Sequence, residues 1–233
     1  MDLNSGRTSG ILQIIWDNRY FIAPFLILFT VIAALLGLQG NDRLFLEVNG
    51  FHSKIADFLF VNLTNMGNGF IAFLVVLVLL RVSYRESLTF LVVTLLLSLL
   101  EYVLKKILFP EFIRPVLYFG PASLHLIPGY NPPLLHTFPS GHSITAFSVC
   151  LFLSFLITKK LWKFFLFFVA LIIGYSRIYI SAHFPFDVVM GSFLAVVVTT
   201  LAFYLSRQIH NDWIDKRIRV RINFRSQNNQ HDS

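Results

Sequence analysis

The sequence predicts an all-α membrane protein, with six transmembrane helices in one bundle and both termini in the cytoplasm. Two features of the composition favour this class. Of the 233 residues, 56% are hydrophobic and 26 are Phe, and the mean hydropathy is +0.69. Only 13% are charged, about half the share that is usual in soluble domains. A soluble domain of this size could not cover so much apolar surface with so few charges, so the expected solvent is a bilayer.

Six apolar stretches approach the length of about 20 helical residues that a bilayer crossing needs. In chain order they are residues 20–38, 67–82, 87–104, 143–158, 161–180 and 186–205. Charged residues lie near the ends of these stretches and not in their middles, which is typical of transmembrane helices. The first stretch lacks the small-residue cleavage site of a signal peptide, so we expect it to remain as an anchor.

Two segments outside these spans are expected to lie on the membrane surface or in the cytoplasm. Residues 55–63 are apolar but contain Asp57 and Asn62, which favours an amphipathic helix on the membrane surface over a seventh crossing. Residues 1–205 are expected to form the membrane domain. Residues 206–233 are expected to form a basic cytoplasmic tail without fixed structure, lying against anionic headgroups. The single cysteine, Cys150, excludes an intramolecular disulfide.

The positions of the lysines and arginines predict the orientation. With the N-terminus in the cytoplasm, thirteen basic residues face the cytoplasm: Arg7, Arg19, Arg81, Arg85, Lys159, Lys160, Lys163, Arg207, Lys216, Arg217, Arg219, Arg221 and Arg225. The remaining six face outward: Arg43, Lys54, Lys105, Lys106, Arg114 and Arg177. Topology therefore explains most of the net charge of +7, and no nucleic-acid partner is expected.

Three groups of polar residues lie on the outer side. The first, 105–115, follows the third span, and the second, 139–142, opens the fourth. The third, 176–187, joins the fifth and sixth spans. The first two share one loop, and two spans separate the second from the third. All three groups are therefore expected at the same face of the membrane.

These residue types suit the binding and transfer of a phosphate group. Lysine and arginine bind phosphate oxygens. Ser140, Gly141 and His142 stand where a helix begins, and backbone N–H groups there favour anions, which a glycine lets approach closely. His183 and Asp187 are four residues apart, so the carboxylate can orient the imidazole. Two histidines can divide the chemistry, one attacking phosphorus and the other protonating the leaving oxygen.

Pro139-Ser140-Gly141-His142 and Ser176-Arg177…His183…Asp187 resemble two signatures of the type-2 phosphatidic acid phosphatases. These are integral membrane lipid phosphatases whose site is related to that of vanadium haloperoxidases and bacterial acid phosphatases. The resemblance extends over nearly the whole chain. The family's first signature is a lysine, six residues, and Arg-Pro.

Arg114-Pro115 fits the end of that first signature, but its lysine is displaced. Seven residues separate Lys106 from Arg114, and eight separate Lys105 from it. We prefer Lys106 because its spacing is closer to that of the family. A one-residue insertion near Pro110 could be absorbed as a kink or a wider turn.

The resemblance implies a role for each residue. His183 would be the nucleophile and become a phosphohistidine, Asp187 would orient it, and His142 would protonate the leaving group and then activate water. The phosphate would be held by Lys106, Arg114, Ser140, Gly141 and Arg177. These cationic side chains would take the place of a metal ion, so no metal site and no cofactor are expected.

The leading prediction is a hydrolase acting on a phosphate monoester or diphosphate of a lipid, in the inner (plasma) membrane of a bacterium, with the site facing the periplasm or exterior. Phosphatidic acid, phosphatidylglycerol phosphate, undecaprenyl diphosphate and a lipid A phosphate all fit. The loop 109–138 carries Tyr118, His125 and Tyr130 and is expected to cover the site and select the lipid. No obligate protein partner is expected.

Two alternatives remain open at this point. The same phosphohistidine would serve a lipid phosphotransferase, which passes the phosphate to an acceptor other than water. A non-enzymatic lipid transporter is the other alternative, but the charge-free middles of the spans disfavour it, because transport paths usually need polar groups at depth.

Overall fold

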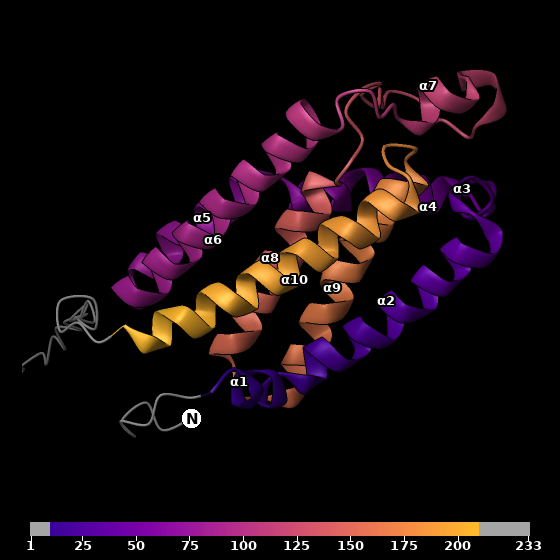
Figure 1. Ribbon diagram of the computed structural model, residues 1–233. Helices are drawn as coiled ribbons and strands as arrows, with labels where there is room; N and C mark the ends of the chain where they lie inside the picture. Colours follow the sequence, from indigo (N-terminus) through magenta and orange to yellow (C-terminus); the bar gives the residue numbers. More distant parts are fainter. Residues whose placement is uncertain (1–9, 210–233) are drawn as a thin grey trace, which may run out of the picture.

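The computed structural model describes residues 10–209, in which the secondary structure is helical and no β-strand occurs. The predicted all-α class is confirmed. One helix covers each expected span: α2 (Arg19–Gln39), α5 (Gly69–Leu80), α6 (Tyr84–Val103), α8 (Gly141–Leu156), α9 (Lys160–Tyr179) and α10 (Pro185–Gln208). Figure 1 shows α8, α9 and α10 in the middle of the bundle, with α2 on one side and α5 and α6 on the other.

Six crossings were expected, but fewer of these helices are long and apolar enough to cross a bilayer by themselves. Four are long and apolar enough to span a bilayer, namely α2, α6 with its continuation to Leu108, α9 and α10. A fifth is α5 joined to the preceding segment Lys54–Gly67 across a bend of 52°. Helix α8 is apolar but has only 16 residues, and α9 and α10 pack against it and bury most of its side chains.

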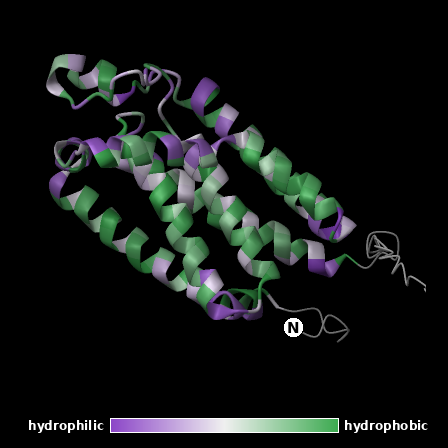
Figure 2. Cartoon of the chain, turned by 180° about the vertical axis from the view of Figure 1, so that it is seen from behind, coloured by the Kyte–Doolittle hydropathy of each residue, from purple (hydrophilic) through white to green (hydrophobic). Residues whose placement is uncertain are grey.

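The surface of the bundle is apolar along its length. Large side chains such as Ile27 and Val78 are more than 60% exposed, and Figure 2 shows hydrophobic residues along the long helices and hydrophilic residues gathered toward the two ends. Hydrocarbon lipid is the solvent that such a surface suits.

Several short helices gather at one end of the bundle (Figure 1). The helix expected at 55–63 is present as α4 (Lys54–Leu63), which continues through a 3₁₀ turn, η1 (Thr64–Gly67), toward α5. Helices α3 (Asn41–Gly50) and α7 (Pro115–Phe119) were not expected from the sequence. Helix α3 is mixed in polarity and α7 has only five residues, so neither carries a span-like pattern.

The opposite end is tied together by charged side chains. Lys163 donates to the Asn18 side chain at 2.6 Å, which joins the start of α9 to the junction of α2 and the short helix α1 (Ile11–Asp17). Arg207 donates to both carboxylate oxygens of Glu86, which joins the end of α10 to the start of α6. The expected tail begins inside α10, and its residues 210–233 lie outside the described residues.

Helices α8 and α10 cross closely where α8 begins. The backbone N–H of Ser140, the N-cap of α8, donates to the carbonyl of Asp187 at 3.1 Å. A Cβ added at Gly191 would lie 2.8 Å from the Ser140 carbonyl oxygen. Glycine is therefore needed at 191, because a backbone atom is the obstacle and cannot swing aside.

We expect Gly191→Ala to lower the free energy of unfolding by about 1–3 kcal/mol, because the added methyl group forces α8 and α10 apart. Gly174→Ala is the matched control, since its Cβ would meet Phe147 and Val188 at an ordinary 3.4 Å and alanine favours the helix. Thermal unfolding of the purified protein in detergent measures both. Equal transition temperatures for wild type and Gly191→Ala would contradict the close crossing.

Candidate active site

The three polar groups of the sequence meet at the end of the bundle that carries α3, α4 and α7. Arg114 precedes α7, Ser140 caps α8, and His183 and Asp187 lie in and after the turn between α9 and α10. Each is at most 7% exposed. The structure thus brings together residues that are up to 73 positions apart (114 to 187).

Arg114 is fixed by backbone carbonyls from two segments. Its Nε donates to Leu135 at 2.9 Å and its Nη1 to Ala182 at 2.8 Å. An isolated antiparallel bridge between Ile113 and Leu135 holds the arginine's own backbone in place. Burial, then the positive charge of Arg177, lower the pKa of Arg114 to about 10, so the guanidinium still carries its charge at neutral pH.

The imidazole of His183 lies directly beside this guanidinium. Its Nε2 is 3.2 Å from Arg114 Nη1. Arginine can only donate, so Nε2 must hold the lone pair and Nδ1 the proton. Burial, followed by the charges of Arg114, Arg177 and Lys105, lowers the pKa of His183 well below its usual value. The ring is therefore neutral, with an unprotonated nitrogen pointing toward a cation.

Thr137 stands between His183 and Asp187. Its hydroxyl donates to Asp187 Oδ2, and His183 Nδ1 is 3.3 Å from the same hydroxyl oxygen. The direct distance from Nδ1 to Oδ2 is longer, 3.6 Å. Asp187 Oδ2 also accepts from the backbone N–H of Phe184 at 2.9 Å. The carboxylate therefore orients the imidazole largely through the threonine hydroxyl.

Sequence reasoning missed Thr137 because a hydroxyl two residues before a Pro-Ser-Gly-His run has no distinguishing pattern of its own. Its only signal is proximity to that run. A second missed residue is Thr64 in η1, whose Oγ1 accepts from Arg177 Nη1 at 2.5 Å. Nothing in the sequence joins residue 64 to residue 177.

Arg177 enters the site from the last turn of α9 and is 4% exposed. Besides the bond to Thr64, it interacts electrostatically with Tyr130 of the loop 109–138. Its Nε is buried without a hydrogen-bond partner among the described residues. A buried donor of this kind is costly unless an acceptor such as a phosphate oxygen meets it.

The side chain of Ser140 caps the first turn of α8. Ser140 Oγ accepts from the Ser143 hydroxyl at 2.9 Å and from the Ser143 backbone N–H at 3.4 Å. The positive charges of Arg177, Lys105 and Arg114 all act on His142, which places this second histidine among the same cations as His183.

The structure brings Lys105, and not the preferred Lys106, to these residues. Lys105 lies within electrostatic reach of His183 and Arg114, and only 15% of its side chain is exposed, whereas Lys106 is exposed. The helix widens here into a π-helical segment, Leu104–Leu108, in which Phe109 N–H bonds to the Leu104 carbonyl. Such a turn absorbs one extra residue, before Pro110 rather than at it.

The loop 109–138 is fastened to α3 and α4. Phe119 stacks on Phe45 with ring centroids 5.5 Å apart. Asn49 exchanges hydrogen bonds with the backbone of His125, whose ring lies 2.9 Å from Asp57 Oδ1. The loop is thereby held over the site end, as the sequence analysis expected of a cover.

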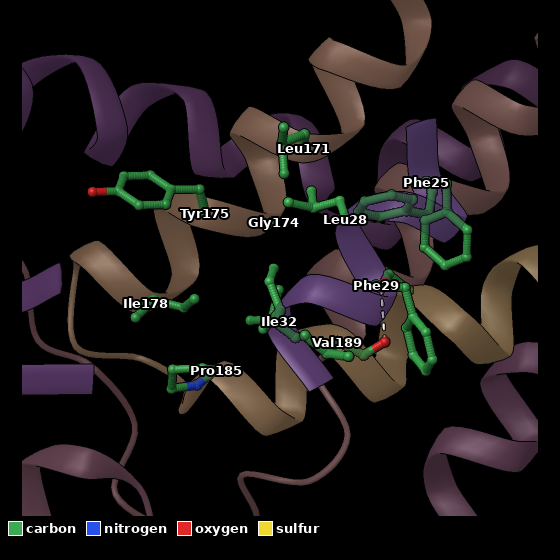
Figure 3. A pocket seen from close by; sticks show the side chains of 13 residues that line it. Phe25, Leu28, Phe29, Ile32, Leu171, Gly174, Tyr175, Ile178, Pro185 and Val189 are labelled. Carbon is green, nitrogen blue, oxygen red and sulfur yellow. Dashed lines mark hydrogen bonds between the residues drawn. The ribbon is translucent and has the colours of Figure 1, made fainter. Parts of the chain in front are cut away.

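An apolar groove opens beside the site, between α2, α9 and α10. Figure 3 shows its lining, which is almost entirely hydrocarbon and includes Leu28, Ile32, Ile178 and Val189. Ile178 follows Arg177 in the chain, and Val188, also in the lining, follows Asp187. The groove therefore reaches the turns of α9 and α10 that carry site residues.

Comparisons with known proteins agree with this geometry. The family model described as the PAP2 superfamily matches residues 86–210. An undecaprenyl-diphosphatase of Sulfolobus acidocaldarius is 23% identical over 215 residues, which cover 86% of this chain and 97% of that protein.

Two solved structures have a similar fold. LpxE of Aquifex aeolicus superposes with a TM-score of 0.63 at 27% identity, over 70% of this chain and 94% of LpxE. The first transmembrane PAP2-type phosphatidylglycerolphosphate phosphatase of Bacillus subtilis superposes with a TM-score of 0.55 at 22% identity, over 83% of this chain and 99% of its own. With such neighbours and its long apolar helices, the chain is an integral membrane protein.

We expect Thr137→Val to lower the kcat for a lipid phosphate roughly 10- to 100-fold, the cost of losing a hydrogen bond to a charged group. Thr137→Ser keeps the hydroxyl and should retain most of the rate. The KM should change little, because Thr137 faces His183 and Asp187 rather than the substrate. A Thr137→Val enzyme with the wild-type kcat would show that Asp187 acts on His183 without the hydroxyl.

Proposed function

Because the chain belongs to the PAP2 superfamily, we propose that it is a membrane phosphatase that hydrolyses a phosphate monoester or diphosphate of a lipid. One observation carries this proposal. The Nε2 lone pair of a neutral, buried His183 lies 3.2 Å from a guanidinium nitrogen of Arg114. A nucleophile and a cation that binds phosphate oxygens are thus adjacent.

In the first step, His183 Nε2 attacks phosphorus, and the bond from phosphorus to the leaving oxygen breaks. His142, which is protonated once the negative charge of the bound phosphate offsets the neighbouring cations, gives its proton to that oxygen. The imidazole gains positive charge as the phosphohistidine forms, and Asp187 stabilises this charge through Thr137. Arg114, Arg177 and the first turn of α8 with Ser140 and Gly141 hold the phosphoryl oxygens.

In the second step, His142 accepts a proton from a water molecule as that water attacks phosphorus. The bond from phosphorus to His183 Nε2 breaks, and inorganic phosphate leaves. Three cationic side chains, those of Lys105, Arg114 and Arg177, supply the positive charge, so we propose that the reaction proceeds without a divalent ion.

The apolar lining of the groove between α2, α9 and α10 supports a place there for part of the substrate's hydrocarbon tail. Its phosphate group would then enter the site from the membrane surface, under the loop 109–138. The relative that hydrolyses undecaprenyl diphosphate supports a polyprenyl substrate, and the phosphatidylglycerolphosphate phosphatase neighbour keeps a glycerolipid open.

We further propose six crossings with both termini in the cytoplasm and the site at the outer face of a bacterial plasma membrane. The basic residues Arg19, Arg85, Lys163 and Arg207 lie at the end of the bundle away from the site. This distribution supports the positive-inside orientation.

The purified wild type is expected to release inorganic phosphate from at least one of four lipids: phosphatidic acid, phosphatidylglycerol phosphate, undecaprenyl diphosphate or a lipid A phosphate. His183→Ala should reduce release to background, and EDTA should leave the wild-type rate unchanged. Transfer of the phosphate to an alcohol in place of water would identify a phosphotransferase. Loss of activity with EDTA would overturn the metal-free mechanism.

Lys105→Ala is expected to lower kcat/KM roughly 10- to 100-fold, because it removes a charge beside His183 and Arg114. Lys106→Ala is the matched control, since it removes the same charge from an exposed neighbour, and its kcat/KM should stay near that of wild type. Steady-state phosphate release measures both. A larger loss for Lys106→Ala would restore the assignment based on sequence spacing.

A further inference from the structure

We propose that the carboxylate of Glu101 is a built-in competitor of the substrate phosphate. In the resting site it lies against the first turn of α8 and on Lys105, and the phosphate must displace it. The competition weakens phosphate binding and helps to expel the inorganic phosphate product. This inference rests on the proposed function.

Glu101 belongs to the last turn of α6, where it is the acidic residue nearest the site on that helix. Its Oε1 lies 2.5 Å from Lys105 Nζ, and the two side chains are 28% and 15% exposed. Lys105 is the lysine that the structure brings to His183. The site lysine is therefore already paired with an internal anion.

The same oxygen lies directly on Gly141. A Cβ added there would be 2.2 Å from Glu101 Oε1 and 2.7 Å from its carboxyl carbon. Gly141 is the first residue of α8, and this is the place where backbone N–H groups favour an anion. The carboxylate thus lies against the glycine at which a phosphate oxygen is expected to approach the backbone closely.

Two anions cannot share this place. The Lys105 ammonium and the first turn of α8 together offer one compact cationic corner, and a carboxylate beside a phosphate would repel it. The atoms that lie on Gly141 are the far end of a flexible side chain. Glu101 is also partly exposed, so its carboxylate has water to move into when a phosphate arrives.

A helical glutamate four residues before a lysine commonly forms a surface ion pair with little effect. Here the pair is turned toward α8 and the catalytic histidines instead of outward. The charge of Glu101 also reaches Arg114, so it opposes two of the cations proposed to hold the phosphate.

The test is inorganic phosphate binding to the full-length protein in detergent, measured by calorimetry. Glu101→Gln keeps the shape of the side chain and removes its charge, and we expect its Kd for phosphate to fall about tenfold. Glu111→Gln, in the exposed part of the loop that follows α6, makes the same change in net charge and should leave the Kd unchanged. Inhibition of lipid turnover by phosphate should strengthen by the same factor in Glu101→Gln.

An unchanged Kd in Glu101→Gln would overturn the proposal, and so would a weaker one, which would show that Glu101 serves to hold Lys105 in place. If Glu101→Gln does not remain monodisperse, Glu101→Asp serves instead, since it draws the carboxylate back from Gly141 and should also tighten binding. Phosphate binding needs no turnover. Failure of the lipid assay would therefore count against the proposed function, and failure of the Kd to fall would count against Glu101.

Discussion

A positively charged guanidinium and a neutral imidazole lie 3.2 Å apart in a space that water hardly enters. Holding them there requires acceptors for the arginine's other donors, since an unsatisfied buried charge is costly. Those acceptors are the carbonyls of Leu135 and Ala182. One comes from the long loop and the other from the turn before α10, so both segments must be in place before Arg114 can face His183. This one contact therefore constrains the positions of the loop, of the turn and of α10.

Several cationic side chains lie close together in this site. Their mutual repulsion gives the site's carboxylates a role that needs no metal ion. Lys105, Arg114 and Arg177 would repel one another strongly in a poorly hydrated site. Asp187 and Glu101 offset part of that repulsion in the resting state. The two carboxylates are held differently. Asp187 accepts from Thr137 and from the Phe184 amide, while among residues 10–209 the Glu101 carboxylate has Lys105 as its one hydrogen-bond partner. A fixed anion orients the nucleophile, and a mobile one can give way to the substrate.

The sequence predicted the parts of the molecule that repeat a simple pattern. Six apolar stretches became six helices with ends within three residues of those expected, because burial in hydrocarbon demands long apolar helices whatever their partners. Arg114, His183 and Asp187 were predicted from motifs and spacing in the chain, and the structure brings them together. Thr137 and Thr64 were not, because their roles arise from contacts across 46 to 113 positions. The choice of Lys106 over Lys105 rested on its spacing from Arg114, which is closer to that of the family signature. The structure has a π-helical turn at Leu104–Leu108 and turns Lys105 toward the site.

The long helices carry most of the residues proposed for the reaction, and the short helices support the loop proposed to select the lipid. His183, Asp187, Arg177 and the start of α8 are carried by the three central helices, whose close crossing at Gly191 leaves little freedom. The loop 109–138 rests instead on α3 and α4, through an aromatic stack, an asparagine and a histidine–aspartate contact. These contacts involve no residue of the reaction. Arg114 and Thr137, which do contact His183, lie near the two ends of the loop, so the part between them can change in sequence with little effect on the nucleophile. Tyr130 is the exception, because it lies close enough to Arg177 to interact with its charge and so links the loop to the phosphate site. A lipid that shifts the loop would alter the cation that binds its own phosphate.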